Sequence, residues 1–239
     1  MEQARIDWQD GTPRSRRFGD VYFSAEDGAG ESRHVFLDGI GAPATWAGRR
    51  RFTIIETGFG SGLNFALTWR AWIASAPADA VLHYVSVEGF PMAADDLRRA
   101  LAAFPEVGDE AAALTALYPP PVPGFHRRHL AGGRVVLTLL FGPVEDMLAS
   151  LSARADAWYL DGFAPRANPD MWTPALFQHM RRLSAPGARF ATFTAAGDVR
   201  RGLAEAGFAV GKAPGFGRKR DCLRGELIAK PDPHPAASP

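Results

Sequence analysis

Three glycines at alternate positions, Gly58, Gly60 and Gly62, separate two apolar segments of the chain. The run before them, Phe52–Ile55, is typical of a buried parallel strand, and the segment after them is typical of a helix. Glycine permits a tight turn with positive φ and lets a ligand approach the backbone at a helix N-terminus. The spacing is not the G-x-G-x-x-G of dinucleotide sites, because its last glycine would fall on Leu63, and the Walker lysine is absent. The turn therefore predicts a nucleotide-like ligand without a pyrophosphate, with an ordinary strand-to-helix turn as the alternative.

Two acids end later strand-like runs. Glu88 ends the run Leu82–Glu88, and Asp161 ends the run Asp156–Asp161. Ligands of open α/β sheets bind beyond the carboxyl ends of the strands, so both acids should share an edge with the glycine turn. The two oxygens of Glu88 match the vicinal hydroxyls of a ribose. The alternatives are an ordinary acid at a strand end for Glu88 and a turn cap for Asp161.

A loop of unusual composition follows Asp161, and a basic loop lies near the end of the chain. The first, Gly162–Trp172, reads GFAPRANPDMW and combines prolines with polar and aromatic groups. The second, Gly215–Arg220, reads GFGRKR. Arginine supplies nearly all the positive charge, and its planar guanidinium suits phosphate. The net charge of only +1 excludes a generally basic nucleic-acid binder, so an RNA contact would require arginine clusters to converge on one face.

The composition limits the class of protein. A chain of 239 residues with 46% hydrophobic residues is long enough for one α/β domain with a sizeable core. No apolar run approaches the roughly 18–20 residues that span a bilayer, and the polar N-terminus has no signal-peptide pattern. The single cysteine, Cys222, excludes an internal disulfide. These features predict a cytoplasmic protein with no membrane contact.

The elements that must position these residues alternate along the chain as strands and helices. Seven strands are expected, at 52–55, 82–88, 134–140, 156–161, 188–194, 208–212 and 222–229. The loop between the last two is too short for a parallel crossover, so the last strand should run antiparallel in an otherwise parallel sheet. The pattern predicts an α/β, Rossmann-like fold.

The ends of the chain are expected to lie outside this sheet. Residues 1–20 read as a polar arm, and Val21–Ser24 and His34–Leu37 as a small N-terminal β-hairpin. We expect an arm and hairpin extension at 1–51, the main domain at 52–230 and a disordered tail at 231–239. His126 and His129 are spaced like metal ligands but lack accompanying acids or cysteines, so a loop or surface position without metal is expected.

Several segments of the chain carry a resemblance to a known family. The longer strings are ETGFGSGLNF (Glu56–Phe65), DAWYLDGFAPRANPDMW (Asp156–Trp172), ATFTAAGDVRRGLAEAGF (Ala191–Phe208) and GFGRKR. They resemble the methyltransferase domain of the MnmC family of tRNA-modifying enzymes. Two shorter strings, DVYFS (Asp20–Ser24) and HVFLDG (His34–Gly39), match the N-terminal hairpin of that family, and the resemblance runs from about Asp7 to Lys230. The resemblance implies the class I S-adenosylmethionine-dependent methyltransferase fold, a seven-stranded mostly parallel sheet whose last strand is antiparallel.

The resemblance also implies an activity. It is the transfer of methyl from S-adenosylmethionine to the amine of 5-aminomethyl-(2-thio)uridine at the tRNA wobble position, giving 5-methylaminomethyl-(2-thio)uridine. Bifunctional relatives carry a C-terminal FAD-dependent oxidoreductase domain that removes a carboxymethyl group, and nothing in this sequence could hold FAD. We therefore expect a stand-alone methyltransferase, with an excised first domain of a bifunctional enzyme as the alternative. It is expected to use no FAD or metal, to contact the tRNA anticodon region and to follow a separate FAD-dependent oxidoreductase in the pathway.

The resemblance implies roles for individual residues. Asp161 is the expected catalytic group, which holds or receives the amine hydrogens. The expected cofactor-binding residues are Glu56, Gly58, Gly60, Gly62, Asn64, Glu88, Gly142 and Asp161. The expected substrate and tRNA contacts are Phe163, Pro165, Trp172, Arg16, Arg17, Arg218, Lys219 and Arg220.

The sequence departs from the family in two places, and other functions stay open. The family has Gly-Asp after the third strand, where Gly142–Pro143 stands here; proline offers no side-chain acceptor and no N–H to adenine, so Glu145 and Asp146 are candidate substitutes. A pair of acids in the N-terminal hairpin is reduced to Glu31. The alternatives are a class I methyltransferase for a small-molecule amine and a non-catalytic RNA-binding module, while the glycine spacing disfavours an NAD-linked oxidoreductase.

Overall fold

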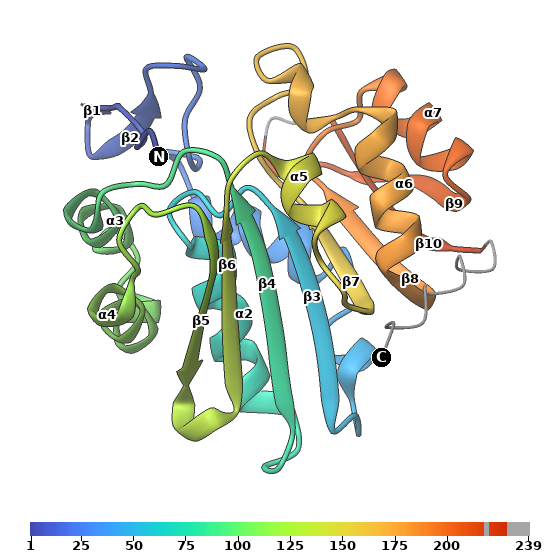
Figure 1. Cartoon of the computed structure of the whole chain (residues 1–239), viewed down its shortest axis with the longest axis horizontal. Coiled ribbons are helices and arrows are strands. Elements are labelled where there is room, and N and C mark those ends of the chain that lie inside the picture. Colours follow the sequence, from blue (N-terminus) through green and yellow to red (C-terminus); the bar gives the residue numbers. More distant parts are fainter. Residues whose placement is uncertain (218–219, 229–239) are drawn as a thin grey trace.

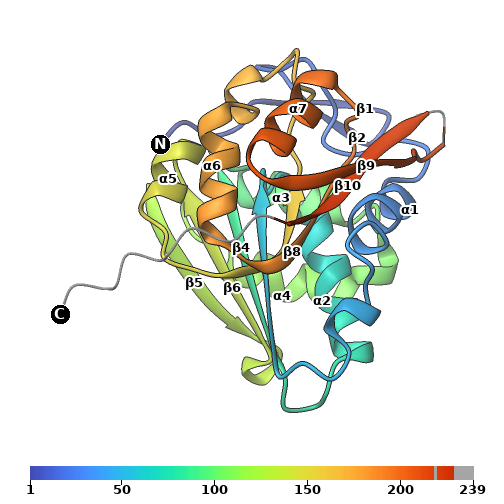
Figure 2. The ribbon, with the colours of Figure 1, turned by 90° about the vertical axis from the view of Figure 1, so that its right-hand side faces the viewer.

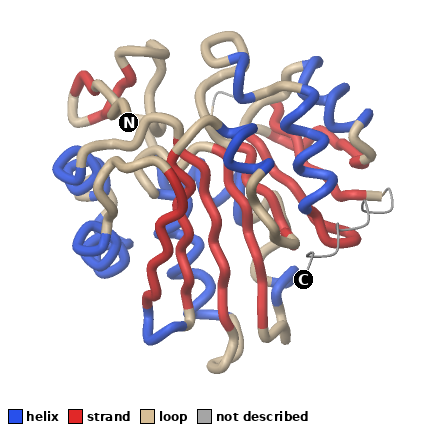
Figure 3. The backbone as a smooth tube through the Cα atoms, viewed as in Figure 1, coloured by secondary structure: helices blue, strands red, loops and turns tan. Residues whose placement is uncertain are grey.

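The computed structural model describes residues 1–217 and 220–228. Its centre is an eight-stranded sheet with the order β5-β6-β4-β3-β7-β8-β10-β9 (Figures 1 and 3). The strands are β3 (Arg51–Thr57), β4 (Val81–Glu88), β5 (Gly124–Leu130), β6 (Val135–Phe141), β7 (Ala155–Leu160), β8 (Ser184–Thr192), β9 (Phe208–Pro214) and β10 (Asp221–Leu227). Only β5 and β10 run antiparallel to their neighbours. The antiparallel last strand expected from the sequence is confirmed.

Helices cover both faces of the sheet. Residues alternate between the faces along a strand, so that Ile54 packs into one core and Ile55 into the other. Helices α2 and α1 lie on one side and α5, α6 and α7 on the other, as Figure 2 shows. The helices are α1 (Gly28–Ser32), α2 (Leu63–Ser75), α3 (Ala94–Leu101), α4 (Gly108–Leu117), α5 (Val144–Ala149), α6 (Pro174–Leu183) and α7 (Gly197–Glu205).

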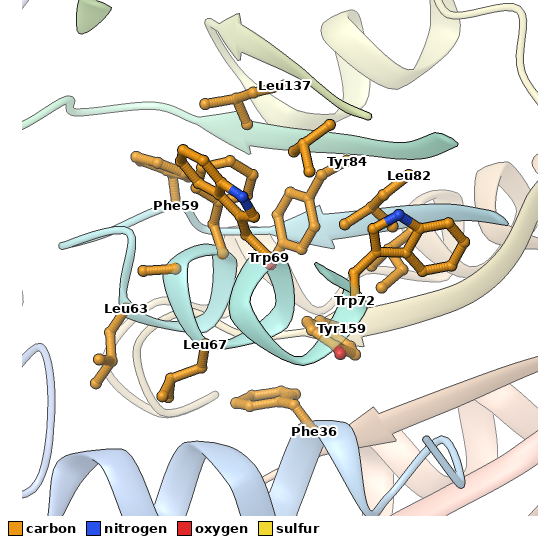
Figure 4. Close-up of a cluster of buried hydrophobic side chains, with 14 of the residues drawn as sticks. Phe36, Phe59, Leu63, Leu67, Trp69, Trp72, Leu82, Tyr84, Leu137 and Tyr159 are labelled. Carbon is orange, nitrogen blue, oxygen red and sulfur yellow. The ribbon is translucent and has the colours of Figure 1, made fainter. Parts of the chain in front are cut away.

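Helix α2, which follows the glycine turn, is buried on nearly all sides. Trp69 and Trp72 pack toward Leu82 and Tyr84 of β4, and Phe36 lies below the helix near Tyr159 (Figure 4). The rings of Phe36 and Tyr159 are 5.1 Å apart. Removing a buried ring of this size costs about 3–5 kcal/mol. The glycine turn is therefore anchored at both ends by buried elements, β3 and α2.

The sheet has eight strands where seven were expected, because β5 was missed. His126 and His129 lie on this strand and not on a loop. Its sequence, GFHRRHL, is polar, yet its side chains alternate between half-buried and exposed along the sheet edge. His126 lies against the ring of Phe141 and hydrogen-bonds to Val122 O. An edge strand needs little apolar character, which explains why the pattern gave no signal.

An N-terminal hairpin is present, but its predicted position was wrong. Its strands are β1 (Ile6–Gln9) and β2 (Thr12–Ser15), inside the segment expected to be an arm. The segment Val21–Ser24 contributes only one bridge, from Val21 to Arg14. Residues 33–37 form one wide helical turn instead of a strand, because Val35, Phe36 and Leu37 are all buried together, whereas a strand would turn Phe36 to the opposite face.

Some expectations concern residues outside the described part of the chain. Arg218, Lys219 and the tail at 231–239 lie there. The domain boundaries at 51 and 230 stay predictions. Among the described residues, no helix combines the length and apolar character needed to cross a membrane.

Candidate active site

Three neighbouring parallel strands end at one edge of the sheet. Thr57, the last residue of β3, lies opposite Val87 of β4 and Leu160 of β7. The glycine turn, Glu88 and Asp161 follow directly, so the structure brings them together at the top of the sheet in Figure 1. The shared edge expected from the strand-end rule is present.

The backbone of the glycine turn has a conformation that residues with a Cβ rarely adopt. Gly58, Gly60 and Gly62 have φ of 89°, 54° and 76°. A Cβ on Gly58 would lie 3.1 Å from the carbonyl oxygen of Asp161 and from Cα of Gly162. Gly62 is the residue immediately before α2 and caps its N-terminus. These glycines allow the turn to pack against the strand end that carries Asp161.

Glu88 is bound to the same turn. Its carboxylate accepts hydrogen bonds from the backbone N–H of Gly60, at 2.9 Å, and of Phe90, at 2.8 Å. Burial raises the pKa of the Glu88 carboxyl, and these N–H donors oppose the rise. Glu88 also lines the cavity, so its two oxygens are within reach of hydroxyl groups of a ligand.

Asn64 joins two acids across the site. Its Nδ2 donates to Glu56 Oε1 at 3.0 Å and to Asp161 Oδ2 at 2.7 Å. Asp161 Oδ1 also accepts from the N–H of Gly162 at 2.8 Å. Glu56 is fully buried, and burial together with the charge of Asp161 raises its pKa to about 8. Burial and the neighbouring charge thus favour the protonated form of Glu56.

Aromatic rings from the N-terminal segment cover the site, a role that was not predicted for them. Phe18 stacks on Phe163 with ring centroids 4.7 Å apart, and Tyr22 meets the same ring edge-on at 5.1 Å. Phe90 completes the cluster beside Phe18. Asp20 Oδ2 accepts from the N–H of Ala164 at 3.4 Å, which ties the two segments together. The DVYFS string was the available signal, but it was interpreted as a strand.

These elements surround a cavity of about 1160 Å³. This exceeds the roughly 300–1,000 Å³ of most small-molecule pockets. The predicted residues that line it are Gly58, Gly60, Asn64, Glu88, Gly142, Asp161, Phe163 and Arg17. The cavity has room for a cofactor and a second reactant together.

Other predicted residues stand back from the cavity wall. Glu56 and Gly62 lie behind it, Arg16 pairs with Asp7, and Trp172 donates from Nε1 to Phe163 O at 3.1 Å. Pro165 is half-buried in the loop after Asp161, and Arg220 is exposed. The roles predicted for these residues stay predictions.

The region after β6 also reaches the cavity. Gly142, Pro143, Glu145 and Asp146 all line it. Glu145 is engaged with Thr173, whose hydroxyl donates to Glu145 Oε1 at 2.5 Å, while Asp146 is exposed. Asp146 is the acid of this pair that has its carboxylate available to a ligand. Within residues 1–217 and 220–228, no three potential metal ligands are grouped.

Curated relatives cover nearly the whole chain. Proteins from Magnetococcus marinus and Chromobacterium violaceum, both named tRNA 5-methylaminomethyl-2-thiouridine biosynthesis bifunctional protein MnmC, are 55% and 54% identical to it over 232 residues each. These matches include 97% and 96% of this chain and 35% of each relative. The chain thus spans about a third of the length of these relatives.

A solved structure has the same fold. It is the crystal structure of MNMC2 from Aquifex aeolicus, with a TM-score of 0.74 and 23% sequence identity, covering 98% of this chain and 73% of that one. The model of a family described as S-adenosyl-L-methionine-dependent methyltransferase matches residues 105–228. This match includes more than half of the chain. The position of the glycine turn, Glu88 and Asp161 at one edge of the sheet agrees with it. The chain belongs to this family of S-adenosylmethionine-dependent methyltransferases.

Proposed function

We propose that the chain methylates the primary amine of 5-aminomethyl-(2-thio)uridine at the wobble position of tRNA, giving 5-methylaminomethyl-(2-thio)uridine. The observation that carries the proposal is the position of Asp161, a carboxylate held at the cavity wall between the glycine turn and an aromatic cluster. The names of the relatives at 54–55% identity support this substrate.

The residues present fit the cofactor. Gly58 and Gly60 bring backbone without side chains to the cavity wall, where a ligand can approach it closely, and Glu88 offers two carboxylate oxygens for a ribose diol. Asp146 can accept from an exocyclic amine of adenine, in place of the acid that Pro143 replaces. When bound, S-adenosylmethionine supplies a methyl group already activated by the sulfonium charge, so the protein has mainly to align the acceptor amine.

Asp161 acts on the acceptor amine. An alkylamine must attack as its free base, but at neutral pH it is mostly an ammonium ion. Each Asp161 oxygen accepts one N–H, and the carboxylate lines the cavity, where it can meet a hydrogen of the amine. A carboxylate alone would stabilise the ammonium, and the aromatic cover of Phe18, Tyr22 and Phe163 opposes this by removing water. Asp161 can then receive the proton that the amine loses on methylation.

The same aromatic cluster suits a nucleobase. An enzyme that modifies a base must take it out of its stack, and aromatic faces stabilise the exposed base. Arg17 lies at the cavity with its guanidinium 4.4 Å from the centre of the Phe90 ring, and Arg166 is exposed on the loop after Asp161. We assign Arg17 and Arg166 to phosphates of the anticodon region. An FAD-dependent oxidoreductase, separate or fused, would supply the amine.

The test is incubation of the protein and S-adenosylmethionine with tRNA from cells that lack this activity, followed by mass spectrometry of the nucleosides. A gain of one methyl on the aminomethyl nucleoside is expected. Asp161→Asn should abolish the gain while cofactor affinity stays within a few-fold, and Asp198→Asn, at an exposed position of α7, should behave as wild type. Transfer to small amines but not to tRNA would overturn the substrate assignment.

A further inference from the structure

Asn64 uses both of its N–H donors inside the protein. One donates to Glu56 and the other to Asp161. The side-chain amide of asparagine has only these two donors, so none remains for a ligand. The side-chain N–H groups of Asn64 therefore serve the site by holding Asp161, next to which Asn64 lines the cavity.

The amide works in only one of its two orientations. If it turned over, its oxygen would face the carboxylate of Asp161, and two acceptors would repel each other. The oxygen instead faces Ser32, whose hydroxyl donates to Asn64 Oδ1 at 2.5 Å. Ser32 is the last residue of α1 and is only 6% exposed. The two acids thus set the orientation of the amide, and the Ser32 hydroxyl holds the amide in place by donating to its oxygen.

We propose that Ser32 is a positioning residue for Asp161 and acts by holding the side-chain amide of Asn64 in place. The chain of contacts runs from the N-terminal helix α1 through α2 to the end of β7. It joins the N-terminal segment to the reacting group, although Ser32 and Asp161 are far apart in sequence. This proposal rests on the role of Asp161 in the proposed function.

A spectroscopic test needs no substrate. The sequence contains two asparagines, Asn64 and Asn168. Selective ¹⁵N-asparagine labelling therefore gives two pairs of side-chain amide proton signals, and Asn168→Ser shows which pair belongs to Asn64. In the wild type, the Asn64 pair should exchange slowly with solvent and be widely separated in proton shift. In Ser32→Ala the pair should converge and exchange at least about tenfold faster. An unchanged Asn64 pair would overturn the proposal.

Enzyme kinetics test whether the Ser32 hydroxyl affects methyl transfer. Ser32→Ala should lower kcat about fivefold to tenfold, as expected when one neutral hydrogen bond is lost. The KM for tRNA and the affinity for S-adenosylmethionine should stay within about twofold. Ser32→Thr keeps the hydroxyl and should restore most of kcat. Equal kcat in Ser32→Ala and wild type would contradict the proposal.

Asp27→Ala is the matched control for disturbance of α1. Asp27 Oδ1 accepts from the N–H of Gly30 at 2.7 Å at the start of the same helix, and Asp27 does not line the cavity. Its loss should loosen α1 without moving Asn64, so kcat should stay near that of the wild type. A fall in kcat as large as that of Ser32→Ala would contradict the proposal, because it would show that kcat depends on an intact α1 and not on the Ser32 hydroxyl. If the amide spectra respond as expected but the wild type methylates no tRNA, the proposed function fails and the Ser32–Asn64 contact stands.

Discussion

Glu88 is held by the turn that it helps to shape, since its Oε2 accepts a hydrogen bond from the Gly60 N–H at 2.9 Å. A second N–H, from Phe90, binds Oε1 at 2.8 Å. The carboxylate at the end of β4 is therefore oriented by two backbone groups before any ligand arrives. Preorganisation of this kind reduces the cost of binding.

Glu88→Gln should weaken the affinity for S-adenosylmethionine by about tenfold or more. The amide turns one acceptor into a donor, which must then face an N–H of either Gly60 or Phe90, and the lost hydrogen bond is worth about 1 kcal/mol. Calorimetry measures the affinity. Glu106→Gln is the control, because Glu106 forms an exposed ion pair with Arg33 and does not line the cavity. Equal affinities for Glu88→Gln and wild type would refute the ribose role.

Gly58→Ala should reduce both stability and cofactor binding. The backbone has φ of 89°, which costs other residues about 1–2 kcal/mol, and the added Cβ would lie 3.1 Å from the Asp161 carbonyl oxygen. Gly48→Ala is the matched control, since Gly48 has φ of 72° with nothing within 4 Å of the added Cβ. Denaturant unfolding should show a larger loss for Gly58→Ala. Equal losses would mean that only the backbone angle matters.

The sheet and half of the site follow from rules that act along short segments. Apolar strands, a glycine turn and acids at strand ends sufficed to place Gly58, Glu88 and Asp161 together, because parallel strands share a carboxyl edge. The cover formed by Phe18 and Tyr22 was missed, since it depends on how the N-terminal segment folds back onto Phe163. The hydrogen bonds from Ser32 to Asn64 and from Asn64 to Asp161 were missed for the same reason, because they join residues that are far apart in the sequence.

Two wrong secondary-structure predictions show why local sequence patterns do not determine the whole fold. The run from Val35 to Leu37 has high β propensity, but its burial against α2 selects a helical turn. Strand β5 has a polar sequence, and only its pairing with β6 makes it a strand. In both, tertiary packing overrides local preference.

Glu56→Gln should change how stability depends on pH. The pKa of Glu56 is raised from 4.5 to about 8, through burial and the charge of Asp161, with Ser86, Asn64 and Tyr84 opposing the rise. Between these values the unfolded chain releases a proton that the native state keeps, so rising pH destabilises the wild type. Relative to Glu56→Gln, the loss should approach about 1.4 kcal/mol per pH unit. Unfolding free energies at several pH values measure the difference, and parallel curves would contradict a protonated Glu56.

Arg17→Gln should weaken tRNA binding and reduce its salt dependence. Arg17 lies at the cavity above the Phe90 ring, and its guanidinium also forms a 3.5 Å ion pair with exposed Glu2. If it contacts one phosphate, the slope of log affinity against log salt should fall by about 0.7–0.9. The matched control is Arg50→Gln, since Arg50 pairs with Asp79 next to the start of β3, at the opposite edge of the sheet. Binding titrations at several salt concentrations give both slopes. An unchanged slope for Arg17→Gln, or an equal fall for Arg50→Gln, would place the RNA surface elsewhere.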